Sequence, residues 1–172
     1  MPSKFLPPIA LSRIEELKTK PDSIVAIYDL LTIPLAEELY HRQTFDFYDE
    51  LSTGQQLLLS YEYVQNQVLQ GGFIQLIQNG YIGLLPDLPE WLEKVAAKPM
   101  AKVIDDVLKV YVLNREALDK KTSVEEFALL YKEFQEFEQL DDEFLQHNEA
   151  TLGLIINYAI NNLAEFCTLI TD

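Results

Sequence analysis

The spacing of apolar positions predicts helices along nearly the whole chain. Apolar residues recur three and four positions apart, which is the period of one face of an α-helix. The clearest stripe begins near Glu149 and comprises Leu152, Ile155, Ile156, Ala159, Ile160, Leu163, Phe166 and Ile170. No Asn-Gly or Asp-Gly turn lies between alternating apolar runs, so hairpins are not indicated. The sequence predicts an all-α fold, a single-domain helical bundle of about seven to nine helices over residues 1–172.

Capping residues and prolines divide this pattern into elements. Ser52 with Gln55, and Ser123 with Glu126, have the spacing of a capping box. Pro34 stands where a new helix is expected to open, since proline suits a first turn. The helices expected are 9–17, 24–31, one opening at 32–34, 53 to about 69, 73–79, 90–97, 100–113, 124–137 and one from about 149 to 170.

A paired glycine, Gly71-Gly72, interrupts the middle of the chain between two apolar-periodic segments. Each glycine inside a helix costs roughly 0.5–1 kcal/mol relative to alanine. The pair therefore predicts a sharp backbone corner, or a place where another backbone comes close.

Composition limits the partners of this chain. The net charge is −15 with a pI near 4.4, and phosphate binding needs Lys and Arg. Direct nucleic-acid binding and attachment to an anionic membrane are therefore disfavoured, and basic proteins are the expected partners. The single cysteine, Cys167, allows no internal disulfide. Together with the absence of a signal-like or membrane-spanning apolar run, this predicts a cytoplasmic protein.

The excess negative charge is concentrated in one segment. Residues 125–149 hold nine acidic side chains and one basic side chain, whereas residues 71–124 are neutral. On a helical wheel, the acidic positions before residue 137 fall within about 100° of each other, opposite the apolar face. The expected partner-binding carboxylates are Glu125, Glu126, Glu133 and Glu136, continued by Asp141, Asp142 and Glu143. A charge run of this kind is either a solvated helix face or an imitation of a phosphate backbone.

The density of charge shows what such imitation requires. Duplex DNA carries about one charge per 1.7 Å, so the roughly 16 Å from residue 125 to 136 would correspond to about ten phosphates. The helix face presents only four carboxylates. Carboxylates from several elements, or a second subunit in a homodimer, are needed to imitate a DNA duplex.

The segment around the paired glycine resembles the central motif of the bacterial DNA-mimic protein (DMP-type) family, otherwise known as a domain of unknown function. The matching positions are Gly71, Gly72, Phe73, Gln75 and Asn79. Gln70 stands where the family has Asn, and residues 1–35 show no recognisable resemblance. The resemblance implies an all-helical domain, with a motif that shapes the fold, and a regulator that imitates DNA. Such a regulator occupies the basic nucleic-acid-binding surface of a partner, for example a transcriptional regulator.

Two other function classes remain open. An immunity-type inhibitor of a basic nuclease toxin would have the same electrostatics. An enzyme with a cryptic metal site is the less favoured alternative: Glu143 and His147 share a helix face, but His41 has no ligand spacing. Cys167 lies among apolar residues, as buried inert thiols do, and no phosphate-binding or dinucleotide motif is present. We therefore expect no enzyme activity, no cofactor and no metal.

Overall fold

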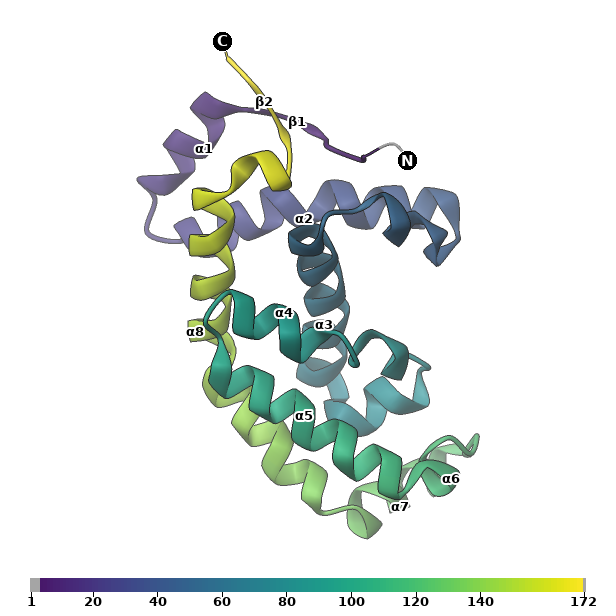
Figure 1. Ribbon diagram of the computed structural model, residues 1–172. Helices are drawn as coiled ribbons and strands as arrows, with labels where there is room; N and C mark the ends of the chain where they lie inside the picture. Colours follow the sequence, from purple (N-terminus) through teal and green to yellow (C-terminus); the bar gives the residue numbers. More distant parts are fainter. Residues whose placement is uncertain (1–3, 172) are drawn as a thin grey trace. The chain divides into compact units, whose positions relative to one another are not determined.

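The computed structural model describes residues 4–171 and confirms the all-α fold (Figure 1). The α-helices are α1 Leu11–Lys18, α2 Ser23–Arg42, α3 Thr53–Gln78, α4 Leu88–Lys94, α5 Lys98–Leu113, α6 Arg115–Leu118, α7 Val124–Glu133 and α8 Glu136–Asn161. Short 3-10 helices lie at η1 Phe45–Glu50, η2 Ile82–Leu84 and η3 Leu163–Glu165. Strands β1 Pro8–Ala10 and β2 Thr168–Ile170 pair in parallel. None of the helices in residues 4–171 has the length and apolar character needed to cross a membrane.

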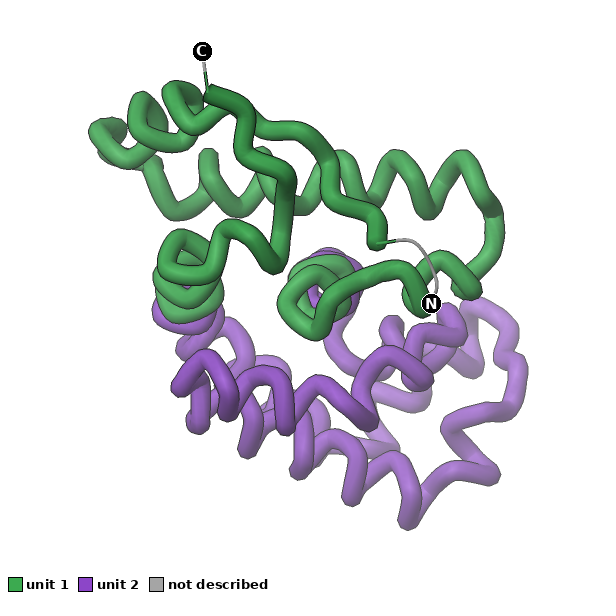
Figure 2. Tube along the Cα trace, turned by 45° about the horizontal axis from the view of Figure 1, so that its top comes forward, with its two compact units in different colours: residues 1–59, 152–172 green, residues 60–151 purple. Residues whose placement is uncertain are grey.

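The chain forms two compact units, coloured separately in Figure 2. Unit 1 comprises Met1–Leu59 and Leu152–Asp172, and unit 2 comprises Ser60–Thr151. Helices α3 and α8 each begin in one unit and end in the other.

Helix α2 forms much of the core of unit 1. Its buried positions include Ile27, Leu31, Leu35 and Leu39, four residues apart along one face. This face continues through Pro34, so the two helices predicted on either side of that proline are one helix. The prediction was wrong because burial on both sides of Pro34 outweighs the loss of a single backbone donor.

The C-terminal helix ends earlier than its apolar stripe predicts. Helix α8 stops at Asn161, and Ile170 belongs to strand β2, with Ile9 of β1 paired to Leu169. The amide of Gln55 donates to the carbonyl oxygens of Phe5 and Phe166, at 2.8 and 3.0 Å. The short sheet was not predicted because each strand's partner lies far away in sequence, where local periodicity carries no information.

Unit 2 is built around the second part of α3. Its buried side chains include Tyr61, Val64, Phe73 and Leu76, and Phe144 of α8 makes ring contacts with Tyr61 and Phe73. Helices α4 and α5 pack together and contribute further apolar residues.

Both predicted capping boxes are present, but one predicted helix is divided. Ser52 and Gln55 exchange side-chain hydrogen bonds with each other's backbone N–H, as do Ser123 and Glu126. The predicted helix 124–137 is interrupted at Phe134, whose φ of −110° and ψ of 64° end α7. Phe134, at this break, and Phe137, in the first turn of α8, are both buried.

Candidate functional site

Exposed carboxylates cover α7 and the start of α8 in unit 2. The exposed residues among the predicted partner-binding set are Glu125, Glu126, Glu133, Glu136 and Asp142, which we call the acidic stripe. Glu143 is half-buried and accepts a hydrogen bond from the Gln139 amide. Asp141 is also half-buried and has a different role, described below.

Most of the acidic stripe has no compensating partner. Within residues 4–171, the carboxylates of Glu125, Glu133, Glu136 and Asp142 make no hydrogen bond or ion pair. Glu126 differs because its carboxylate accepts the backbone N–H of Ser123 in the capping box of α7. The stripe therefore presents a negative potential that the protein itself does not neutralise.

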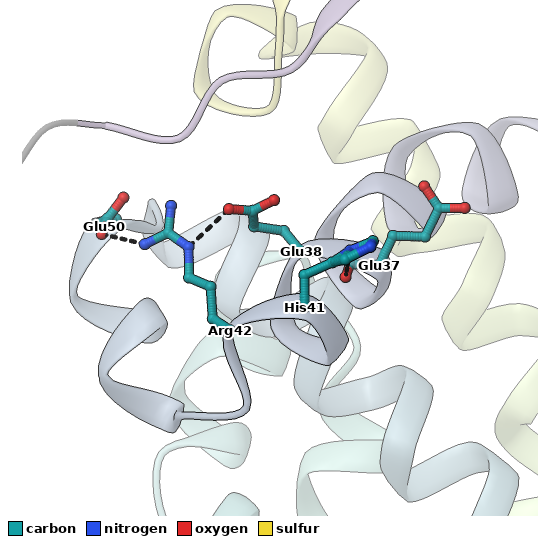
Figure 3. A network of polar contacts seen from close by, with 5 residues as sticks. All are labelled: Glu37, Glu38, His41, Arg42 and Glu50. Carbon is teal, nitrogen blue, oxygen red and sulfur yellow. Dashed lines mark hydrogen bonds and ion pairs between the residues drawn. The ribbon is translucent and has the colours of Figure 1, made fainter.

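Carboxylates elsewhere in the chain are often paired. Figure 3 shows Arg42 between Glu38 and Glu50, and the Arg42 guanidinium also lies 4.7 Å from the Phe47 ring centroid. Asp106 binds both Lys102 and Lys109, and these lysines lower the pKa of its carboxyl, with Lys102 the larger influence. Such ion pairs neutralise the carboxylates locally, whereas most carboxylates of the acidic stripe have no cationic partner among the described residues.

Asp141 binds the backbone of Phe73, the residue that follows the glycine pair. Its Oδ1 accepts a hydrogen bond from the N–H of Phe73, 2.8 Å away. Burial, followed by the nearby carboxylates of Asp142 and Glu138, raises the pKa of Asp141 to about 6, although the hydrogen bond from Phe73 acts in the opposite direction. Asp141 is therefore less exposed than the acidic stripe, and one of its carboxylate oxygens is used within the protein.

The glycine pair forms a clamped corner within α3. Gly72 has φ 77° and ψ −178°, a conformation that side-chain-bearing residues rarely adopt. A Cβ at Gly72 would lie 2.2 Å from Asp141 Oδ2. The hydroxyl of Tyr131, on α7, donates to the carbonyl oxygen of Gly71. The corner is thus held by one hydrogen bond from α7 and one from α8.

The other motif residues belong to a cluster of amides. Asn79 Nδ2 donates to Gln67 Oε1 at 2.7 Å, and Gln75 Nε2 lies 3.3 Å from the same oxygen. Gln75 also donates to Gln70, the residue that departs from the family pattern. A shallow cavity of about 490 Å³ adjoins this cluster, lined by Gln75, Gln78, Asn79, Thr122, Ser123, Val124 and Phe127.

The residues considered for a metal site or a reactive thiol are not brought together with suitable partners in the described part of the chain. Within the described residues, no group of three or more His, Cys, Asp or Glu side chains is placed to hold a metal ion. Cys167 is buried, and burial raises the pKa of its thiol. His147 and Glu143 lie one turn apart on α8, without a third ligand among the described residues.

Comparison with known proteins identifies the family. The model of the DMP19-like proteins matches residues 49–162. The chain belongs to this family. It is 29% identical over 119 residues to the DNA mimic protein DMP19 of Neisseria meningitidis serogroup B (strain ATCC BAA-335 / MC58), covering 67% of this chain and 72% of that protein. The part matched by the DMP19-like model contains the glycine corner and the acidic stripe, whereas α1 and α2 lie outside it.

Sequence reasoning missed the two residues that hold the corner. Asp141 was grouped with its acidic neighbours, and Tyr131 was not singled out. Their contacts join positions 68 and 60 residues apart. The paired glycine was the available signal, since a backbone corner needs partners for its free N–H and C=O groups.

Proposed function

We propose that this member of the DMP19-like family is a non-enzymatic regulator that imitates DNA. In this role it occupies the basic nucleic-acid-binding surface of a partner, such as a transcriptional regulator, in the cytoplasm. The name of the meningococcal relative supports the proposal. The observation that carries it is the uncompensated acidic stripe on α7 and α8, because a cationic groove would supply the neutralisation that the chain lacks.

The acidic stripe has the physical properties expected of such a surface. Its carboxylates are exposed and mutually repelling, so they contribute little to the stability of the fold. They attract a cationic surface from a distance, which accelerates association more than it adds affinity. Salt weakens this attraction, because the screening length falls to about 8 Å at physiological ionic strength.

Imitating the charge density of duplex DNA requires more carboxylates than α7 alone presents. Helix α7 spans ten residues, or about 15 Å, along which duplex DNA would present about nine charges. Carboxylates of α7 and α8 must therefore act together. A homodimer is included in the proposal because a second copy would double the carboxylates available to a DNA-binding site.

The first step of the test identifies the partner. The protein is immobilised, exposed to host lysate and eluted with a salt gradient, and the captured proteins are identified by mass spectrometry. A DNA-binding regulator among the salt-eluted proteins is the expected result. Capture of a nuclease toxin would instead indicate an inhibitor of immunity type.

The second step measures association with the purified partner by surface plasmon resonance at two salt concentrations. The stripe variant carries Glu125→Gln, Glu133→Gln and Glu136→Gln. The control carries Glu90→Gln, Asp105→Asn and Glu116→Gln, which are exposed, outside the acidic stripe and equal in charge change. Asp106 is not used because it is ion-paired. The stripe variant should associate more slowly than the control, especially at low salt.

Competition with DNA decides between imitation and simple charge attraction. The partner's own DNA site should displace the protein from the partner, and the protein alone should not bind that DNA. Simultaneous binding of DNA and protein to the partner, or equal association rates for the two variants, would refute the proposal.

A further inference from the structure

Helix α2 presents a second surface, on the side opposite its buried face. Asp29, Ile33, Glu37 and Tyr40 are all exposed and fall within about 80° of each other on the helix. We call these four residues the α2 face. Ile33 is 51% exposed and Tyr40 is 74% exposed, so two large apolar side chains alternate with two carboxylates over about 17 Å of helix axis.

The carboxylates of the α2 face are uncompensated. Neither Asp29 nor Glu37 makes a side-chain hydrogen bond or ion pair in the part of the chain from residue 4 to 171. The neighbouring Glu38 shows the contrast: it binds Arg42, whereas Glu37 points away from that guanidinium (Figure 3). The contact of His41 Nδ1 in this region is with the backbone oxygen of Glu37 and leaves the carboxylate free.

The charge of the α2 face selects its occupant. The α2 face itself carries two carboxylates and no basic side chain, with His41 in edge contact with the Tyr40 ring at its end, so two copies of this face would bring carboxylates against carboxylates. An anionic membrane surface is repelled for the same reason. A cationic segment is attracted, and the exposed ring of Tyr40 offers a face for a Lys or Arg side chain.

We propose that the α2 face is a docking surface for a cationic amphipathic helix of a protein partner. Such a helix places apolar side chains against Ile33 and Tyr40 and basic side chains against Asp29 and Glu37. The alternation of the α2 face matches the three- and four-residue spacing that an amphipathic helix presents. This surface lies outside residues 49–162, the part matched by the family model, and the inference is independent of DNA imitation by the acidic stripe.

The test uses a fluorescently labelled lysine–leucine peptide with leucine at helical spacing, and an isomer of the same composition with scrambled order. Binding is measured by fluorescence anisotropy at physiological ionic strength. One variant of the α2 face is Ile33→Gln with Tyr40→Gln, and the other is Asp29→Asn with Glu37→Gln. Each should weaken binding of the amphipathic peptide by about tenfold or more. The scrambled isomer should bind the unmodified protein at least about tenfold more weakly.

Matched controls separate this surface from general attraction to an acidic protein. Val112→Gln with Leu113→Gln removes exposed apolar side chains of unit 2, and Asp105→Asn with Glu116→Gln removes exposed carboxylates there. Both controls should change affinity by less than about twofold. Circular dichroism checks that helix content is retained, and Ile33→Ala with Tyr40→Ala replaces the Gln pair if it is not.

Each contrary outcome overturns the inference. Loss of binding with the charge pair but not with the apolar pair would mean that only charge attracts the peptide. Equal binding of the scrambled isomer would mean the same. Loss only in the variant of Glu125, Glu133 and Glu136 would place the peptide on the acidic stripe, leaving the proposed function intact while refuting the α2 face.

Discussion

Glu165 accepts a hydrogen bond from the backbone N–H of Gly54, with an N to Oε1 distance of 2.8 Å, although the residues are 111 positions apart. This contact caps the start of α3 with a side chain from the C-terminal part of the chain. Asp141 likewise accepts a hydrogen bond from the backbone N–H of Phe73, where α3 resumes after Gly72. Two carboxyl groups of a strongly acidic chain therefore accept hydrogen bonds from the backbone of the two segments of one helix.

The stability of the protein should depend on the ionisation of Asp141. Its pKa is raised from 3.8 to about 6 by folding, so the folded state binds this proton more tightly than the unfolded state. The stabilisation is fully present below about pH 4 and is lost as the pH rises through about 6. Asp141→Asn keeps an acceptor for Phe73 without the charge, so its stability relative to the parent protein should increase between pH 4 and pH 7 in urea unfolding.

Asp141→Ala is the informative companion to that variant. It leaves the Phe73 N–H without its acceptor and should destabilise the protein by about 1–3 kcal/mol near pH 4, where the folded protein holds the Asp141 carboxyl protonated. Equal destabilisation by Asn and Ala at pH 7 would show that the negative charge itself is needed at the corner.

Alanine substitutions at three glycines should rank in a defined order. Gly72 has a positive φ and no room for a Cβ, Gly80 has φ 83° but open space, and Gly83 has open space without a positive φ. Gly72→Ala should be the most destabilising, Gly80→Ala should cost roughly 1 kcal/mol from strain alone, and Gly83→Ala should be nearly neutral. Melting temperatures measured by circular dichroism give the ranking. Full stability of Gly72→Ala with lost partner binding would identify the corner as a recognition site.

Removing the cap of α3 should weaken unit 1. The Glu165 carboxylate accepts hydrogen bonds from the Gly54 N–H and the Tyr158 hydroxyl, so Glu165→Ala should cost about 1–3 kcal/mol in urea unfolding. Tyr158→Phe removes one of these bonds and should cost less. Glu37→Ala, on the exposed side of α2 in unit 1, is the control, and an equal effect there would argue against capping.

Two isoleucines of α8 should differ in their contribution to the core. Ile156 is 2% exposed, whereas Ile160 is only half-buried. Ile156→Ala should cost about 2–5 kcal/mol and Ile160→Ala distinctly less. Unchanged urea midpoints for both variants would exclude a core role for this part of the stripe.

Local signals predicted local structure well. The capping boxes at Ser52 and Ser123 were found because both partners lie within one turn of helix. Pro34 was wrongly predicted to start a new helix, because proline normally interrupts a helix. The burial of residues on both sides of Pro34, which keeps α2 continuous, is visible only in the folded chain. The β1–β2 pairing was missed because its hydrogen bonds join distant segments, such as the Thr168 N–H to the Pro7 carbonyl oxygen.

The candidate site shows the same division. Exposure of Glu125 and Glu133 follows from helical periodicity, and the structure places both in solvent. The half-buried position of Asp141 does not follow from the sequence. Its neighbours Leu140 and Asp142 are the same whether its carboxylate faces water or a backbone N–H from a distant segment. The structure therefore shows a contact that the sequence did not predict: the half-buried Asp141 carboxylate accepts the backbone N–H of Phe73.

The division of unit 1 between two distant stretches of sequence has a consequence for synthesis. Unit 2 is one continuous segment, Ser60–Thr151, so all of its residues have been translated before Leu152 is added. Unit 1 lacks the carbonyl of Phe166, which Gln55 binds, and the whole of strand β2 until residues 166–170 have been translated. We expect the stretch up to Leu59 to remain incompletely folded until then, although it is translated before unit 2, and a chain truncated after residue 151 to be able to form only unit 2.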